Sequence, residues 1–290
     1  MQSIRTYAPD IITKRLGLRA SIEFRLFDTL AGLGSFALEN PEAIRGSGGR
    51  REWSGGQNWR DAAISCRTGD ISRVAASDNL LAQMEQYELA TPRRVWIDDV
   101  CGPLPNVPAF LSGLPQSMRR RERDESANAP LAIIVDLTTS AAISAEDINT
   151  RGAALLALVR TLSARRPVEL WVCAGEDAIS SGAGFVAARL ETSPLDLSSA
   201  AYALTHAGLV RALMYGVLGG DPAIRSRGLW PFSRSPLTRT EMEAAFAPAM
   251  SHVTETLCIP GIHKEDPCVN DPLAWLARQI AEHAPVSLDA

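Results

Sequence analysis

Long apolar runs are missing from this 290-residue chain, which excludes the simplest membrane-protein architecture. No run approaches the roughly 20 apolar residues that a membrane-spanning helix needs. Residues 1–7 also lack the apolar core of a signal peptide. The five cysteines are odd in number and widely spaced, which argues against a disulfide framework and favours a reducing compartment. We therefore expect a cytoplasmic protein.

Basic residues are fewer than acidic residues, and lysine is almost absent. The 29 Lys and Arg residues are outnumbered by 33 Asp and Glu residues, and Lys14 and Lys264 are the only lysines. The net charge of −4 provides no general basic field that would draw the chain onto nucleic acid. The densest basic run, residues 118–125, carries acids in its second half and is predicted to be a solvated loop. We therefore expect no nucleic-acid partner.

Common catalytic motifs are missing as well. The glycine clusters at 182–184 and 219–220 lack the lysine of a phosphate-binding loop and the third glycine of a dinucleotide fingerprint. The chain contains neither a Gly-x-Ser-x-Gly elbow nor a His-Glu-x-x-His motif. These absences favour a non-enzymatic role.

Hydrophobic periodicity predicts an α/β fold, with a mostly parallel sheet flanked by helices. Residues 131–135 form the short apolar run that is typical of a buried parallel strand. Ser144 and Asp147 form a capping-box pattern ahead of a helix predicted over 145–164. Residues 168–174 are predicted to be the next strand, and 185–191 an antiparallel edge strand beside it. Later elements are helices over 198–216, 240–250 and from 271 onward, and a last strand over 255–260.

The N-terminal part has a less regular pattern and is predicted to be a mixed, loop-rich α+β region. Residues 22–26 alternate like a half-buried strand, and Asn58 is predicted to cap a helix over 58–68. A second helix is predicted over 77–88, followed by a strand over 94–98. The charged stretch 119–128 is the predicted linker, so we divide the chain into residues 1–128 and an α/β domain over 129–290.

The most informative motif is Asp136-x-Thr138-x-Ser140, at the end of the first predicted parallel strand. Ligands of open α/β sheets bind at the carboxyl ends of strands, and Mg²⁺ prefers several oxygen ligands. The spacing therefore indicates a divalent-cation site. The alternative is that these residues serve turn and cap chemistry, for which Asp, Ser and Thr are the usual residues.

On these residues the C-terminal half resembles a von Willebrand factor A domain, whose metal site begins with Asp-x-Ser-x-Ser. The resemblance implies that Asp136, Thr138 and Ser140 occupy the first three ligand positions, with Thr in place of the middle Ser. It also implies a hydroxyl ligand after the edge strand and an Asp beyond the fourth strand. Candidates for these two positions are Asp196, Ser198, Ser199, Thr205, Asp266 and Asp271. We place Asp266 in the predicted metal site.

A second, broader resemblance is to an uncharacterised family of phage and prophage proteins. It rests on the tryptophans around Trp53-Ser-Gly-Gly, on the proline-rich segment 102–121 and on 151–158. The resemblance implies a bacterial-host cytoplasm or a virion, and it carries no information about activity. Four aromatic residues, Trp53, Trp59, Phe110 and Trp230, either form an exposed binding surface or pack a small core.

The predicted function is therefore a non-enzymatic module that binds a protein partner, with a divalent cation such as Mg²⁺ bridging the contact. One alternative is a metal-free virion structural or assembly protein, which could self-assemble. Another is a metal-dependent phosphoryl-transfer or nuclease-type enzyme, for which the acids near Asp136 are few.

Overall fold

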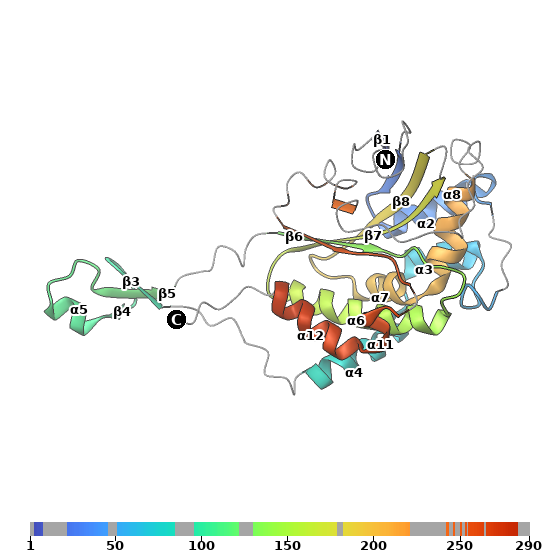
Figure 1. Cartoon of the computed structure of the whole chain (residues 1–290). Coiled ribbons are helices and arrows are strands. Elements are labelled where there is room, and N and C mark those ends of the chain that lie inside the picture. Colours follow the sequence, from blue (N-terminus) through green and yellow to red (C-terminus); the bar gives the residue numbers. More distant parts are fainter. Residues whose placement is uncertain are drawn as a thin grey trace.

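One six-stranded sheet organises the computed structural model of the chain, with strand order β1-β2-β8-β7-β6-β9 (Figure 1). The structure describes residues 3–7, 22–45, 51–84, 96–121, 130–178, 182–220, 255–263 and 265–283, together with positions 242, 243, 246, 250 and 253. No helix of these residues is both long enough and apolar enough to cross a membrane.

The strands of this sheet are mostly parallel, which confirms the predicted α/β class. Strand β6 (Leu131–Asp136) lies between β7 (Val168–Ala178) and the edge strand β9 (Glu255–Ile259), and both pairings are parallel. On the other side of β7 follow β8 (Gly182–Leu190), antiparallel, and then β2 (Ile22–Phe27), parallel to β8. At the far edge, β1 (Ser3–Tyr7) is antiparallel to β2.

The unit β6–α6–β7 forms as the sequence predicts. Helix α6 (Ala145–Ser163) begins with a reciprocal capping box, in which Asp147 N–H donates to Ser144 Oγ at 3.0 Å. In return Ser144 N–H donates to Asp147 Oδ2, also at 3.0 Å. These bonds satisfy two donors that a helix start leaves open, and so they fix where the chain leaves the β6 end.

Helices cover one face of the sheet (Figure 1). The alternate residues Leu131, Ile133 and Val135 of β6 pack into this helical layer, whereas Ala132 and Ile134 belong to the core on the opposite face. The larger helices of the layer are α2 (Leu30–Glu39), α3 (Trp59–Thr68), α4 (Val74–Met84), α6, α7 (Leu197–Thr205) and α12 (Pro272–His283). Shorter elements are η1 (Pro41–Ala43), η2 (Ile71–Arg73), a π-helix (Leu209–Met214), α8 (Tyr215–Gly220) and α11 (Pro267–Asn270).

N-terminal residues contribute to the same sheet and the same core as the C-terminal half. Strand β2 lies beside β8, so the predicted edge strand 185–191 has neighbours on both sides, and its edge position was wrong. The largest apolar cluster contains Phe27, Leu33 and Met84 together with Leu131 and Leu155. The core is thus not divided where we placed a boundary between residues 1–128 and 129–290.

Other predicted elements differ at their bounds. The helix expected over 198–216 is interrupted after Thr205, because His206 is extended and its Nδ1 accepts a hydrogen bond from Gly208 N–H at 2.8 Å. The helix expected over 77–88 is α4, which begins earlier, at Val74. The Asn58-capped helix is confirmed as α3. Of the helix expected over 240–250 the structure describes positions 242, 243, 246 and 250, where Met250 N–H donates to the Phe246 carbonyl at 3.1 Å. Residues 122–128 of the predicted linker lie outside the described residues.

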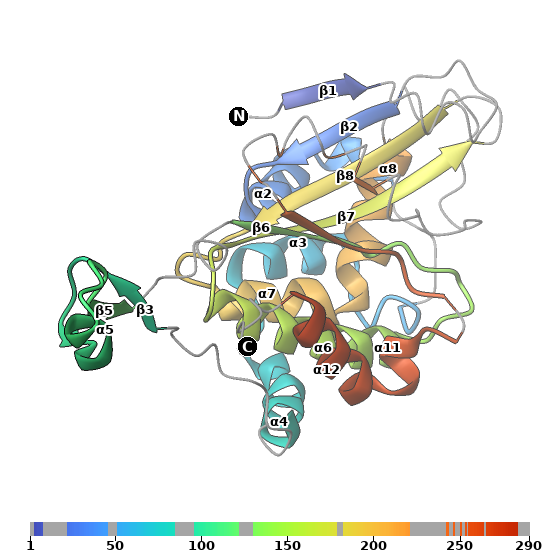
Figure 2. The ribbon, with the colours of Figure 1, turned by 60° about the vertical axis from the view of Figure 1, so that its left-hand side comes forward.

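A small unit stands apart from the main sheet in both views (Figures 1 and 2), and we call residues 96–121 the arm. It contains β3 (Trp96–Asp99), β4 (Leu104–Pro105), the short helix α5 (Val107–Leu111) and β5 (Met118–Arg121). Its three strands form an antiparallel sheet of order β3-β5-β4. The basic run predicted as a loop therefore begins with a strand.

Candidate functional site

The predicted metal motif lies where β6 ends, and its first two side chains bind backbone N–H groups. Asp136 is fully buried, and its Oδ1 accepts a hydrogen bond from Thr138 N–H at 2.8 Å. The Oγ1 of Thr138 accepts from Gly175 N–H of β7 at 3.0 Å. The carbonyl of Thr138 accepts from Ile262 N–H at 3.1 Å. These bonds fasten the β6 end to β7 and to the segment after β9.

Ser140, the third residue of the motif, closes a turn. Its Oγ accepts a hydrogen bond from Ala142 N–H at 3.2 Å, and its carbonyl accepts from Arg211 Nη2 at 3.3 Å. A hydroxyl that bonds the N–H two residues further on is typical turn chemistry. This arrangement matches the alternative that the sequence left open for the motif.

A buried arginine, Arg151 of α6, joins the ends of two strands. The residue is 4% exposed, and its Nη1 donates to the carbonyl of Asp136 at 3.3 Å. Its Nη2 donates to the carbonyl of Pro260, just after β9. Its Nε lies 3.4 Å from Asp266 Oδ2, as an ion pair without a hydrogen bond. The guanidinium therefore lies between two of the predicted metal ligands, Asp136 and Asp266.

Asp266 reaches the β6 end as the sequence predicts, although its partner there is Arg151. It is 8% exposed, and its Oδ1 accepts from Cys268 N–H at 2.8 Å, which caps α11. A divalent cation at this place would lie beside a buried guanidinium, and charges of the same sign repel strongly away from water. No cluster of three or more His, Cys, Asp or Glu side chains could hold a metal ion within the described part of the chain. This donor set does not fit a divalent cation.

The other candidate ligands serve caps and helix backbones. Asp196 caps α7 by accepting from Ser199 N–H at 3.1 Å, and Asp271 accepts from Ala274 N–H at 3.0 Å. The hydroxyl of Thr205 donates to the carbonyl of Ala201 at 2.7 Å. The structure thus gives each of them a local structural role.

A second buried arginine, Arg211 of the π-helix, ties the loop after β6 to the Trp53 segment. Its Nη1 donates to the carbonyl of Trp53 at 2.7 Å, and its Nη2 donates to the carbonyl of Ile143 at 2.6 Å. The guanidinium carbon lies 4.6 Å from the centre of the Trp53 ring, a cation–π contact. Burial lowers the pKa of Arg211 to about 10, so the side chain is still charged at neutral pH.

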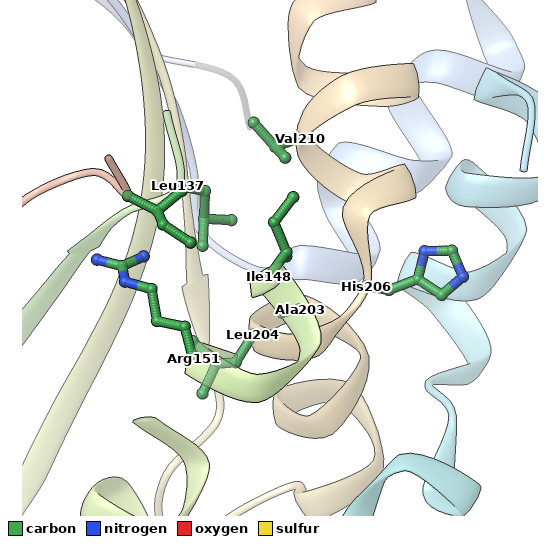
Figure 3. Close-up of a pocket in the computed structure, with 8 residues that line it drawn as sticks. Leu137, Ile148, Arg151, Ala203, Leu204, His206 and Val210 are labelled. Carbon is green, nitrogen blue, oxygen red and sulfur yellow. The ribbon is translucent and has the colours of Figure 1, made fainter. Parts of the chain in front are cut away.

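The cavity beside these arginines is too small for a substrate (Figure 3). Its volume is about 10 Å³, whereas one water molecule needs about 10–15 Å³. Leu137, Ile148 and Val210 line it, and the ring of His206 points away from it. Burial lowers the pKa of His206 to about 4, so this histidine is neutral at pH 7.

A wider, open depression of about 480 Å³ lies between the end of α6 and residues 192–197. Its charged side chain, Arg160, is already engaged, because Nη1 lies 2.6 Å from Asp78 Oδ1 and 2.9 Å from Ser77 Oγ. The remaining lining is hydroxyl and apolar, which provides neither a nucleophile–base pair nor a charge for an ionic substrate.

The arm, by contrast, presents a concentrated apolar surface. The described residues contain eight exposed large hydrophobic side chains, and six of them lie on the arm. Phe110 is 69% exposed and Leu111 is 78% exposed. We call the six the apolar patch: Val100, Leu104, Val107, Phe110, Leu111 and Leu114. Monomeric proteins rarely gather so many apolar side chains in one exposed place unless something binds there.

The backbone of the arm is well specified despite this exposure. A side chain at Gly102 would collide with the Arg119 carbonyl, since an added Cβ would lie 2.2 Å from that oxygen. Asn106 caps α5 by accepting from Ala109 N–H at 3.3 Å. Gly113, with φ of 71°, turns the chain after the helix. The loop between β3 and β5 is therefore held in one shape.

Two ion pairs join the strands of the arm. Arg119 Nε lies 3.1 Å from Asp98 Oδ1, and Arg120 pairs with Asp99. Hydrogen bonds from Asn106 and then Arg119 hold the pKa of Asp98 below its usual value. The bond from Arg120 does the same to the pKa of Asp99. With Arg121 as a third arginine, the charges of the arm sum to +1.

The predicted aromatic surface divides between core and arm. Trp53 and Trp59 pack against the main core, which corresponds to the predicted alternative of core packing. Phe110 is exposed on the arm, and Trp230 lies outside the described residues. The prediction of one aromatic surface formed by Trp53, Trp59 and Phe110 is therefore wrong.

Two signals for the missed residues are present in the sequence. Val107, Phe110, Leu111 and Leu114 have the i, i+3, i+4, i+7 spacing of a helix that binds in a groove, inside an uncharged stretch, residues 100–117. Arg151 stands between Ile148 and Leu155, on the apolar face of α6, where a charged residue needs a buried partner. The first signal points to the arm, and the second to the Arg151 cluster.

Residues 22–267 match the family described as a domain of unknown function, DUF7192. The match covers most of the chain, which therefore belongs to this family. No protein with a curated description matches the chain, and no solved structure does.

Proposed function

We propose that this DUF7192 protein is a non-enzymatic interaction module that binds a protein partner through the arm. The observation that carries the proposal is the apolar patch, six exposed hydrophobic side chains on a unit that stands apart from the main sheet. Interfaces depend on a few large, well-desolvated anchors, and Phe110 with Leu111 supply the largest exposed pair. Helix α5 exposes Val107, Phe110 and Leu111 at i, i+3 and i+4, with Leu114 in the turn after it, and such a segment suits an apolar groove on a partner.

In this proposal the residues at the end of β6 have a structural role. Arg151 places a positive charge between Asp136 and Asp266, so binding through the arm does not require a cation. Docking through a divalent cation held by Asp136, Thr138, Ser140 and Asp266 is the alternative that the sequence suggested. We favour docking without metal, because the buried Arg151 guanidinium binds the backbone carbonyl of Asp136 and pairs with the Asp266 carboxylate.

A phage or prophage setting, which the second sequence resemblance implies, is kept as part of the proposal. Virion assembly is one role that an exposed apolar arm would suit, since assembly proteins bind neighbours through large apolar contacts. An enzymatic role receives less support. The Asp136–Arg151–Asp266 cluster is closed by internal bonds, and the adjoining cavity has room for about one water molecule.

The proposal is tested on a partner identified by in-cell cross-linking and then purified. We expect the double variant Phe110→Ser, Leu111→Ser to weaken binding at least about thirtyfold, because loss of one anchor typically costs about 2 kcal/mol. The control Ile64→Ser, Ile71→Ser removes two exposed apolar side chains of the main body and should leave the affinity unchanged.

The same titration with EDTA separates the two docking modes. An affinity that EDTA does not change supports docking through the arm alone. An affinity that falls with EDTA, and that Asp136→Ala also abolishes, supports the cation-dependent mode. Equal affinities for the wild type and the arm variant contradict the proposal.

A further inference from the structure

We infer that the arm binds the arm of a second copy of this chain, which makes the protein a two-fold dimer. The inference rests on the proposed function, since it takes the arm as the contact element and names its occupant. It starts from the interior of the arm. Between residues 97 and 120 only Asn106 and Ala109 are buried.

A unit of this size cannot stabilise itself with so small an interior. Folded units below about 40 residues usually need disulfides, metals or oligomerisation. The arm has no disulfide, since Cys101 is free and exposed. Its described residues also contain no metal-binding cluster. Burial of the apolar patch against another protein surface is the remaining source of stability, and a second copy of the chain can supply that surface.

The surface of the arm is compatible with itself. From Val100 to Ser117 the sequence has no charged residue, so two copies can meet face to face without repulsion between like charges. The charges that flank this stretch are of both signs, and two ion pairs join them, Asp98 with Arg119 and Asp99 with Arg120. With Arg121 the arm carries a net charge of only +1, so the repulsion between two copies is small at physiological salt.

These paired charges also argue against a membrane as the occupant. Segments that bind anionic lipid combine apolar side chains with unpaired Lys or Arg. Arg119 and Arg120 instead face aspartates on the neighbouring strand. The uncharged face favours protein over lipid.

The apolar patch is large enough for a stable pair. Six side chains that are about half to three-quarters exposed offer on the order of 600 Å², so two copies would bury on the order of 1,200 Å², where specific interfaces begin. The i, i+3, i+4 spacing of Val107, Phe110 and Leu111 places these anchors on one side of α5, and Leu114 follows Gly113 in the turn after the helix. Two such ridges can pack against each other.

Sedimentation equilibrium of the full chain tests the inference. The wild type is expected to sediment as a dimer that dissociates on dilution. Phe110→Ser with Leu111→Ser should raise the dissociation constant at least about thirtyfold. Leu111→Met keeps an apolar anchor and should remain dimeric. Ile64→Ser with Ile71→Ser, on the main body, should match the wild type. Thermal unfolding of each variant shows whether its main body is folded.

The possible outcomes distinguish a second copy of the chain from a lipid surface or another protein as the binding partner of the arm. A wild type that is monomeric at every concentration overturns the inference, as does a dimer that the arm variant leaves intact. Flotation with phosphatidylglycerol–phosphatidylcholine vesicles that the arm variant abolishes makes lipid the occupant and also overturns it. If the wild type is monomeric while the arm variant still loses the cross-linked partner, this inference fails and the proposed function stands. If the arm variant changes neither assembly nor partner binding, both fail.

Discussion

Arg151 allows the most informative perturbation of the β6 end, because one buried guanidinium holds three partners. Its nitrogens bond the carbonyls of Asp136 and Pro260, and its Nε pairs with Asp266 at 3.4 Å. Arg151→Met keeps an unbranched apolar stem and removes every donor. The mostly buried Asp266 carboxylate then loses the guanidinium that pairs with it. Removing one partner of a buried ion pair costs about 3–5 kcal/mol, and we expect the free energy of unfolding to fall by that amount.

Urea unfolding followed by tryptophan fluorescence measures this loss, and a double-mutant cycle assigns its cause. Asp266→Asn keeps an oxygen that can accept from Cys268 N–H while it removes the charge. If the stranded carboxylate dominates, Asp266→Asn should be milder in the Arg151→Met background, with a coupling energy of about 1–3 kcal/mol. A loss below about 1 kcal/mol for Arg151→Met, or strict additivity of the two changes, would refute this reasoning.

Three further predictions concern pH, cations and the arm. The folded pKa of His206, about 4, lies below its ordinary value of 6.5, so its contribution is complete above pH 6.5 and is lost as the pH falls toward 4. Urea unfolding should show that His206→Asn removes roughly 3 kcal/mol of the stability difference between pH 7 and pH 4; an unchanged difference contradicts this origin. Neither Mg²⁺ nor EDTA should shift the Tm of the wild type, whereas a rise with Mg²⁺ that Asp136→Ala abolishes would restore the cation site. Gly102→Ala should remove hydrogen-exchange protection from residues 96–121 and leave the main-body Tm unchanged, because its Cβ would lie 2.2 Å from the Arg119 carbonyl; protection equal to the wild type would show that the arm adapts.

Elements specified by local chemistry could be predicted from the sequence. The capping boxes at Asn58 and Ser144 and the apolar run of β6 each depend on residues a few positions apart, and all three are found in the structure. The antiparallel pairing of β8 with β7 was also foreseeable, because the two strands follow each other directly.

Elements that depend on distant neighbours could not be predicted in this way. Strand β8 was taken as an edge because its second neighbour, β2, lies about 160 residues earlier in the chain, and no local pattern links Phe24 to Phe185. The helix after Asp196 was predicted to be too long, because its end at Thr205 depends on the hydrogen bond that the His206 ring accepts from Gly208 N–H. Both differences are tertiary effects.

The candidate site, too, could be predicted from the sequence only in part. Sequence placed Asp136 and Asp266 at the same sheet edge, and the structure brings both to Arg151. The motif alone could not reveal that a guanidinium from α6 lies between them, because Arg151 is 15 residues away from Asp136 in the chain. The arm was missed as a unit because the proline-rich passage 103–115 predicts only ordered coil or a short helix. The structure contains that short helix, α5, and adds a three-stranded sheet whose pairings the sequence did not reveal.

We propose that the arm, and not the β6 end, is the interaction surface. Photo-cross-linking in cells tests this proposal, with a photoreactive residue placed in turn at Leu111 on the arm and at Ile71 on the main body, both exposed apolar positions. We expect discrete cross-linked products from position 111 and none from position 71. Products from position 71 alone, or the same products from both positions, would show that the arm is not the interaction surface.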